Sequence, residues 1–161
     1  MTTPQHAAID TNVLVALVDS RDHWHASAHA LREALQGRGA DLVYFDPVLN
    51  EAISVLARRA QEQGRSSQFA DLLDTLTHQV PPEAITWLSA ETQRLYSQVI
   101  ALVRNTSGKL NFHDALIALG CQELGIAIIA SFDRDLDQVT WLTRVETPDA
   151  VVTAFKPAPV D

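Results

Sequence analysis

Cysteine and lysine are scarce in this chain of 161 residues. Its one cysteine, Cys121, excludes a disulfide framework and a zinc site built from cysteines, and it agrees with a reducing compartment. Two of the 12 basic residues are lysines, Lys109 and Lys156, which excludes a lysine-rich arm that binds a partner. The 20 acidic residues give a formal net charge of −8, so the overall field of the protein does not favour nucleic acid.

Long apolar runs and flexible linkers are also missing. No stretch approaches the ~18 apolar residues of a membrane span, and the first ten residues do not resemble a secretory signal. No repeat or Gly/Ser-rich linker divides the chain, and its 47% hydrophobic content is enough for a core. We therefore expect a cytoplasmic protein without a membrane partner, formed by one domain over residues 1–155 and a short tail over 156–161.

Short apolar segments alternate with amphipathic segments along the sequence. The apolar segments are bounded by turn residues, and the amphipathic ones repeat their apolar residues at helical spacing. Strands are expected at 7–9, 41–45, 85–88, 126–130 and 140–145. Helices are expected at 12–18, 26–36, 47–63, 66–78, 90–105, 112–124 and 148–155. This alternation predicts an α/β fold with three layers, in which helices cover both faces of a mostly parallel sheet of about four to five strands.

Four carboxylates from distant parts of the chain are expected near one edge of that sheet. Asp10 and Asp133 each follow a predicted strand, and sites in parallel sheets form beyond the carboxyl ends of the strands. Glu51 and Asp114 each lie near the start of a predicted helix. Taken singly, each has an ordinary structural interpretation, as a cap, as a residue favoured by the helix dipole or as a solvated boundary residue.

The four carboxylates together require a further explanation, because crowded carboxylates repel one another and raise one another's pKa. A hard divalent cation among them removes this repulsion. Mg²⁺ and Mn²⁺ prefer oxygen ligands and need only one or two direct carboxylates in addition to water and substrate phosphate. Such an ion activates water and stabilises charge on a phosphodiester, so the residues point to phosphodiester chemistry.

Four short motifs surround these carboxylates. They are Ile9-Asp10-Thr11-Asn12-Val13-Leu14, Asn50-Glu51, His113-Asp114-Ala115-Leu116-Ile117-Ala118 and Ser131-Phe132-Asp133-Arg134-Asp135-Leu136. In their order, their spacing and their coverage of the whole chain, they resemble the PIN-domain nucleases. Within that family the chain looks like the VapC toxins of bacterial type II toxin–antitoxin pairs.

The resemblance implies a fold, an activity and a set of partners. It implies a PIN-like sheet between helices and an endoribonuclease that depends on Mg²⁺ or Mn²⁺. It also implies that a cognate antitoxin holds the enzyme inactive and that the protein forms a homodimer. By the same resemblance, the catalytic carboxylates are Asp10, Glu51, Asp114 and Asp133, the metal ligands among them are Asp10, Asp114 and Asp133, and the supporting residues are Asn12, Ser131 and Asp135.

Contacts to RNA phosphates must come from individual basic side chains. Arginine suits phosphate because its guanidinium group forms paired hydrogen bonds. The candidates cluster near the end of the Glu51 helix and just before the Asp114 helix. They are Arg58, Arg59, Arg65, Arg104 and Lys109. For Arg58 and Arg59, a solvated helix end stabilised by the helix dipole is the alternative.

Two other features keep more than one interpretation. Trp24 is expected where an exposed loop enters a helix, either packed there or in contact with a partner, and the histidines around it lack a third metal ligand. The other feature is a set of apolar residues at helical spacing, which is typical of a core. The resemblance gives a second interpretation, in which the same region is an interface with the antitoxin or with a second copy of the chain. This set is Phe69, Leu72, Leu73 and Leu76.

Three other functions compete with the toxin. A phosphatase of the haloacid-dehalogenase type needs a second aspartate where Asn12 stands, and neither lysine lies where its downstream lysine belongs. A non-catalytic binding module would tolerate the loss of acids that this chain retains. A PIN-domain nuclease with a role in RNA processing is the third.

The acidic charge itself takes on a different meaning once a site is assigned. Removing the four site carboxylates from the 20 acidic residues leaves 16 against 12 basic ones, or −4. Half of the excess charge therefore belongs to the proposed site, where bound cations would offset it. The composition still predicts weak non-specific binding of RNA. It favours recognition by shape, metal and a few arginines, together with an antitoxin whose binding segment is basic.

Overall fold

A five-stranded parallel sheet lies at the centre of the computed structural model, which describes residues 5–155. The strand order is β3-β2-β1-β4-β5, and each neighbouring pair is parallel. The strands are β1 (His6–Ile9), β2 (Asp41–Phe45), β3 (Ile85–Thr86), β4 (Ile128–Ala130) and β5 (Thr143–Val145). The predicted parallel sheet is therefore confirmed. The predicted tail at 156–161 lies outside the described residues.

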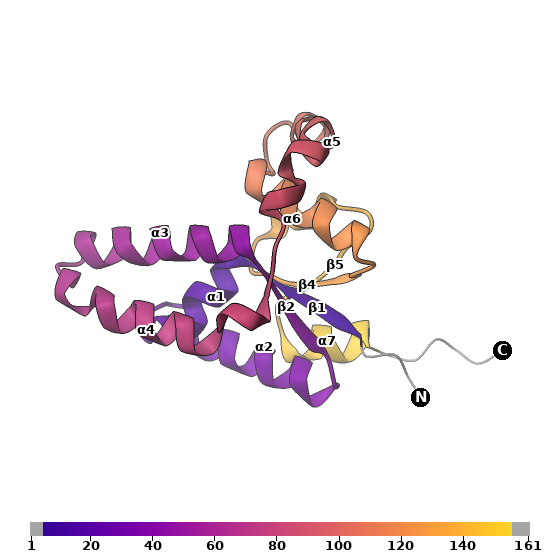
Figure 1. Cartoon of the computed structure of the whole chain (residues 1–161). Helices are drawn as coiled ribbons and strands as arrows, with labels where there is room; N and C mark the ends of the chain where they lie inside the picture. The colour runs from indigo at the N-terminus through magenta and orange to yellow at the C-terminus, as the bar shows by residue number, and fades with distance from the viewer. Residues whose placement is uncertain (1–4, 156–161) are drawn as a thin grey trace.

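Helices cover both faces of the sheet (Figure 1). They are α1 (Thr11–Val18), α2 (His25–Gly37), α3 (Asp46–Glu62), α4 (Phe69–Gln79), α5 (Thr92–Asn105), α6 (Phe112–Glu123) and α7 (Pro148–Ala154). The helices α2 and α7 lie on one face, while α6 lies on the other with α5 packed outside it (Figure 1). This arrangement confirms the predicted three-layer α/β/α architecture.

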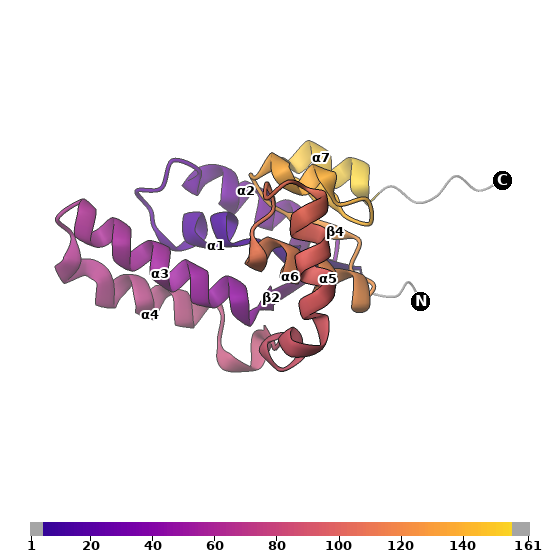
Figure 2. The same ribbon diagram turned by 90° about the horizontal axis from the view of Figure 1, so that it is seen from above.

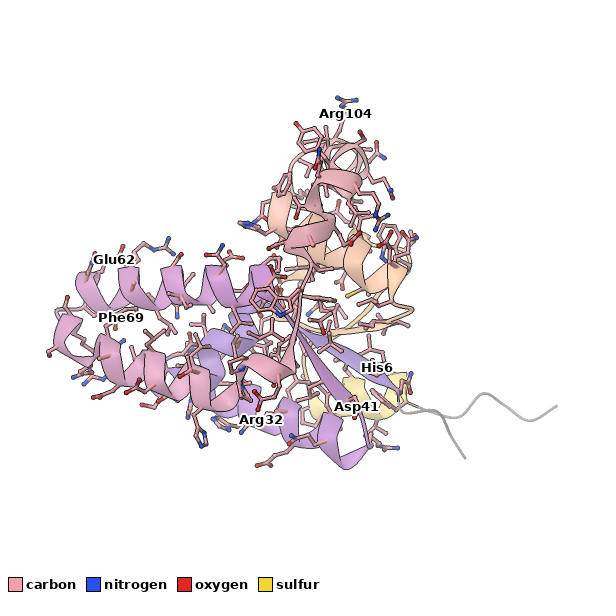
Figure 3. The ribbon with its side chains drawn as sticks, viewed as in Figure 1. His6, Arg32, Asp41, Glu62, Phe69 and Arg104 are labelled. Carbon is pink, nitrogen blue, oxygen red and sulfur yellow. The ribbon has the colours of Figure 1, made fainter. Side chains whose placement is uncertain are left out.

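An antiparallel helix pair, α3 with α4, extends away from the sheet (Figure 2). Glu62 at the end of α3 and Phe69 at the start of α4 mark its outer turn (Figure 3). The predicted helix at 66–78 begins instead with a 3₁₀ turn at Ser66–Gln68, where the backbone N–H of Gln68 donates to the carbonyl of Arg65. Such tighter turns are common where a chain reverses into a helix.

The core explains why the central elements are so apolar. The β1 residues from Ala7 to Ile9 have no exposed surface, as expected for a strand with a neighbour on each side and helices on both faces. Buried residues run without interruption from Ala115 to Cys121 in α6, because this helix lies between the sheet and α5. None of the helices in residues 5–155 is long and apolar enough to cross a membrane.

Three strands are shorter than the sequence predicts. Strands β4 and β5 occupy only the last three residues of the predicted runs at 126–130 and 140–145. The apolar run at 85–88 forms only two residues of β3. The buried carboxylate of Asp46, at the start of α3, accepts hydrogen bonds from the backbone N–H of Leu88 and the hydroxyl of Ser89. The chain leaves the sheet at this point because Leu88 donates to a side chain and not to a neighbouring strand.

Candidate active site

The strand order places a switch point between β1 and β4. The chain continues from β1 toward β2 and β3 on one side, and β4 and β5 lie on the other side. Ile9 pairs with Ala130, so the residues that follow them, Asp10 and Ser131, lie side by side. The backbone N–H of Asp10 donates to the carbonyl of Ala130 at 3.0 Å. Sites in open parallel sheets form at such a point, beyond the carboxyl ends of the strands.

Asp10 is held by three donors at this switch point. One carboxylate oxygen accepts from the hydroxyl of Ser131 at 2.6 Å and from the amide of Asn12 at 3.1 Å. The other oxygen accepts from the backbone N–H of Thr11 at 2.8 Å and so caps α1. Burial raises the pKa of Asp10, while the Ser131 and Thr11 hydrogen bonds oppose that rise. These contacts fix the orientation of a carboxylate that is only 5% exposed.

Asn12 and Ser131 also connect β4 to α1. The side-chain carbonyl of Asn12 accepts from the backbone N–H of Phe132 at 3.0 Å. The hydroxyl of Ser131 accepts from the backbone N–H of Asp133, also at 3.0 Å. Asp133 in turn accepts from the backbone N–H of Asp135 at 2.9 Å. The predicted supporting residues Asn12 and Ser131 therefore contact Asp10 directly. Asp135 reaches the site through its backbone.

The remaining two carboxylates come from the starts of α3 and α6. Glu51 accepts a hydrogen bond from the hydroxyl of Thr11 at 3.2 Å. Asp114 forms a capping box with Asn111, in which each side chain accepts from the backbone N–H of the other residue, at 2.9 and 3.1 Å. The capping interpretation of Asp114 is therefore correct, and it does not compete with a place in the site.

All four carboxylates line one cavity of about 210 Å³. The pKa of Asp114 is raised to about 6, chiefly by burial and also by the negative charges of Asp10, Glu51 and Asp133, while the Asn111 hydrogen bond opposes the rise. The cavity is smaller than the ~300–1,000 Å³ typical of small-molecule sites. It therefore has room for an ion, water and a phosphate, while the rest of a nucleotide must lie outside it.

The chemistry of the donors fits a hard divalent cation, because the four acidic groups offer only oxygen ligands. As the side chains lie, however, no three His, Cys, Asp or Glu residues among residues 5–155 are grouped so as to hold an ion. Both oxygens of Asp10 accept hydrogen bonds, and Asp114 and Asp133 each use one oxygen in a cap. A carboxylate has about four lone-pair sites, so each of the three acids keeps sites for an ion while it accepts these hydrogen bonds.

The predicted basic contacts divide into three groups. Arg58 and Arg59 line the cavity, and Arg59 also donates to Asp22 in the loop before α2. Arg104 and Lys109 are exposed but are not among the described residues that line the cavity, and Arg104 lies at the outer end of α5 (Figure 3). Arg65 is not among the described residues that line the cavity.

Arg65 is buried and belongs to a structural ion pair. Its side chain is 5% exposed and donates to both oxygens of Asp19, at 2.8 and 3.3 Å. The turn after α3 folds the guanidinium group back against the end of α1. Arg65 is therefore unavailable to RNA phosphates, and we withdraw it as a candidate contact.

Sequence reasoning missed three contributors to the site. Thr11 holds Glu51, Asp22 holds Arg59, and Trp24 stacks on Phe132 beside Asp133. Thr11 was visible as the residue after Asp10, but nothing in the sequence signals its contact with a side chain 40 residues away. The Asp22–Arg59 contact spans 37 residues in the same way.

Fold and cavity together define a parallel α/β protein with a carboxylate site at the switch point of its sheet. The family model of the PIN domain matches residues 7–142, which is more than half of the chain and includes all four carboxylates. The protein therefore belongs to the PIN domain family. This membership does not support the phosphatase alternative. No curated protein matches the sequence.

Two solved structures are similar to this chain. VapBC2 from Rickettsia felis, bound to a DNA fragment from its promoter, has 15% identity and a TM-score of 0.63, over 88% of this chain and 98% of that chain. Mycobacterium tuberculosis VapC20, a sarcin–ricin loop cleaving toxin, has 19% identity and a TM-score of 0.63, over 83% of this chain and 95% of that chain. At these identities the likeness shows a shared fold.

Proposed function

We propose that this protein is a divalent-metal-dependent endoribonuclease and the toxin of a type II toxin–antitoxin pair. The observation that carries the proposal is the convergence of four carboxylates on one cavity, where burial and, to a smaller extent, the charges of the other three raise the pKa of Asp114. Negative charge concentrated in this way costs free energy of folding unless a cation or a proton offsets it. Membership of the PIN family supports a nuclease, and the RNA-cleaving activity named for VapC20 supports RNA as the substrate.

The roles of the residues follow from their contacts. Asp10 and Asp114 would hold a Mg²⁺ or Mn²⁺ ion, and Asp133 would complete the shell or hold a second ion. When bound, the ion supplies a more acidic water and offsets charge on the phosphodiester. Asn12 and Ser131 keep the Asp10 carboxylate oriented toward the cavity through their hydrogen bonds.

The other cavity residues act on water and phosphate. The hydroxyl of Thr11 holds one oxygen of Glu51, and the other oxygen is available to accept a proton from the attacking water. Attack on phosphorus then breaks the bond to the 3′ oxygen, which takes up a proton from solvent, so the products are a 5′-phosphate and a 3′-hydroxyl. Arg58 and Arg59 face the cavity from α3 and supply positive charge to the phosphate oxygens.

An antitoxin partner and a homodimer belong to the same proposal. The VapBC2 structure contains a toxin with its antitoxin, which supports a partner of that kind. Phe69, Leu72 and Leu73 on α4 are only partly buried against the core and offer apolar surface on the extended helix pair. The net charge of −8 favours an antitoxin segment that is basic. We place this pair in the cytoplasm.

The test is cleavage of structured RNA by the purified protein with Mn²⁺, in the presence and absence of a chelator. We expect Asp10→Asn and Asp114→Asn to lower the cleavage rate by at least ~100-fold, because each keeps the shape of the side chain but removes a ligand charge. Asp149→Asn is the matched control, since Asp149 lies in the first turn of α7, is exposed and does not line the cavity. Full Mn²⁺-dependent cleavage by either site variant would refute the assignment.

A further inference from the structure

An aromatic pair lies beside the carboxylate cavity. Trp24, at the end of the loop between α1 and α2, stacks on Phe132 with ring centroids 4.8 Å apart and planes inclined by 16°. Phe132 lies between Ser131 and Asp133 in the chain, so the pair is next to the site. Trp24 nevertheless remains 45% exposed. Neither ring is among the described residues that line the cavity, but the neighbour of Phe132, Asp133, does line it, so accessible indole surface lies close to the cavity residues.

Contacts from both sides hold this pair in place. The Asp22 carboxylate accepts from the backbone N–H of Trp24 at 2.7 Å, and its other oxygen accepts from Arg59, which lines the cavity. On the opposite side, Asn12 accepts from the backbone N–H of Phe132 at 3.0 Å. The backbone at each ring is thus tied to cavity residues on α3 and α1, and the rings stack on each other, so the pair is positioned relative to the carboxylates before a ligand arrives.

Size and chemistry indicate what this surface binds. The cavity of about 210 Å³ is too small for a whole nucleotide, so a base attached to a phosphate in the cavity must lie at the edge. Aromatic faces are the usual protein surface for unpaired bases, because stacking works with any base. His23 stands nearly perpendicular to Trp24, at 78°, and is itself exposed, which adds a polar ring beside the stacking surface.

We propose that Trp24, supported from behind by Phe132, is the stacking platform for a nucleobase adjacent to the scissile phosphate of single-stranded RNA. The inference rests on the proposed ribonuclease function and deepens it. It defines the substrate class as an RNA segment with an unpaired base at the cleavage site, because a base inside a duplex has no free face. Selection then comes from the loop or bulge that presents the base, together with the few arginines at the cavity.

Steady-state cleavage of a single-stranded oligoribonucleotide with Mn²⁺ tests the platform. We expect Trp24→Ala and Trp24→Leu to raise KM by ~5- to 100-fold with little change in kcat, and Trp24→Phe to retain most of the affinity. Leucine is close in size to phenylalanine but has no aromatic face, so comparison of the leucine and phenylalanine variants separates stacking from packing. Thermal unfolding checks that each variant is folded. Equal KM values for the leucine and phenylalanine variants would overturn the proposal.

A second tryptophan supplies the matched control. Trp87 is 64% exposed, makes none of the aromatic contacts found within residues 5–155 and does not line the cavity. Trp87→Leu is expected to leave KM unchanged. An equal rise in KM in this variant would overturn the proposal, because the effect would then follow from the loss of any exposed indole.

Abasic nucleotides identify the base that stacks. Each nucleotide around the cleaved bond is replaced in turn by an abasic one, and KM is measured with the wild type and with Trp24→Ala. We expect an abasic nucleotide at one position to raise the KM of the wild type as much as Trp24→Ala does. The KM of Trp24→Ala should not rise further when the same nucleotide is abasic. If the effects of Trp24→Ala and of an abasic nucleotide on the free energy of binding add at every position, stacking on Trp24 is refuted, since the side chain and the base then act independently.

A binding measurement separates failure of the platform from failure of the proposed function. Tryptophan emission of the wild type and of Trp24→Phe is followed as single-stranded oligoribonucleotide is added in chelator. Quenching that is lost in Trp24→Phe supports the platform even if no RNA is cleaved. Metal-dependent cleavage with KM unchanged in all Trp24 variants would refute the platform while the nuclease assignment stands.

Discussion

The buried ion pair between Asp19 and Arg65 gives a sharp prediction about stability. The two side chains are 4% and 5% exposed, and the guanidinium group donates to both carboxylate oxygens. Asp19→Asn keeps the shape of the side chain but leaves the Arg65 charge buried without its counter-ion. Breaking one side of a buried pair costs about 3 kcal/mol of unfolding free energy. For a chain of this size that corresponds to a fall in Tm of ~6–12 °C.

A solvent-exposed pair of the same geometry provides the control. Arg94 donates to both oxygens of Glu123, at 2.8 and 2.6 Å, but these side chains are 53% and 39% exposed. Glu123→Gln makes the same change from carboxylate to amide. Because water screens an exposed pair, we expect the Tm of Glu123→Gln to equal that of the wild type within the error of the measurement. Thermal unfolding followed by circular dichroism measures both variants side by side.

The pH dependence of the difference in Tm between the wild type and Asp19→Asn provides a second check. Burial on its own raises the pKa of Asp19, but the hydrogen bonds from Arg65 and Arg21 and the Arg65 charge outweigh it, so the pKa is lowered overall. Its stabilisation is therefore complete above the unfolded pKa of ~3.9 and is lost as pH falls through the folded value. The gap in Tm should be full at pH 7 and should close below about pH 4. A Tm of Asp19→Asn at pH 7 no lower than that of Glu123→Gln would refute the reasoning.

Two further predictions concern Asp114 and the Cys121 thiol. Because the pKa of Asp114 is raised to about 6, its favourable contribution is present below the unfolded pKa and is lost as pH rises through 6. In chelator, Asp114→Asn should therefore melt above the wild type at pH 8, and this advantage should shrink at pH 5; a variant that melts below the wild type at pH 8 would contradict this. Burial, with a smaller effect from the charge of Asp10, raises the pKa of the Cys121 thiol to about 12. The thiol should react with a disulfide reagent only after unfolding, and rapid labelling of the native protein would contradict its burial.

Much of the site was predictable because strand ends and helix starts are local features. Asp10 and Asp133 each follow a short apolar strand, and the rule for parallel sheets brings such ends to one edge. Glu51 and Asp114 follow from helix-start signals, with Pro47 before the first and Asn111 before the second. Each of these signals spans only a few residues. The convergence of the four on one cavity then follows from the topology.

The contacts that sequence reasoning missed are made between residues far apart in the chain. Arg65 looked like an RNA contact because it lies near other arginines, but its partner Asp19 is 46 residues earlier. Asp46 shortens β3 through Leu88, 42 residues later. Such pairs leave no periodic trace in the sequence, since one side chain meets another only after the layers have packed.

The contacts of Asn12 determine what a mutation at this position does to the site. Aspartate at position 12 is the pattern of a different class of hydrolase, and a single-base change in the codon converts asparagine to aspartate. Yet the Asn12 amide donates both to Asp10 and to Ser131 while its carbonyl accepts from Phe132. Aspartate can replace the acceptor but not the donors, and it places a new negative charge against Asp10. A single-base change at this codon therefore replaces two hydrogen bonds with repulsion against Asp10, so the position of that carboxylate depends on an amide at position 12.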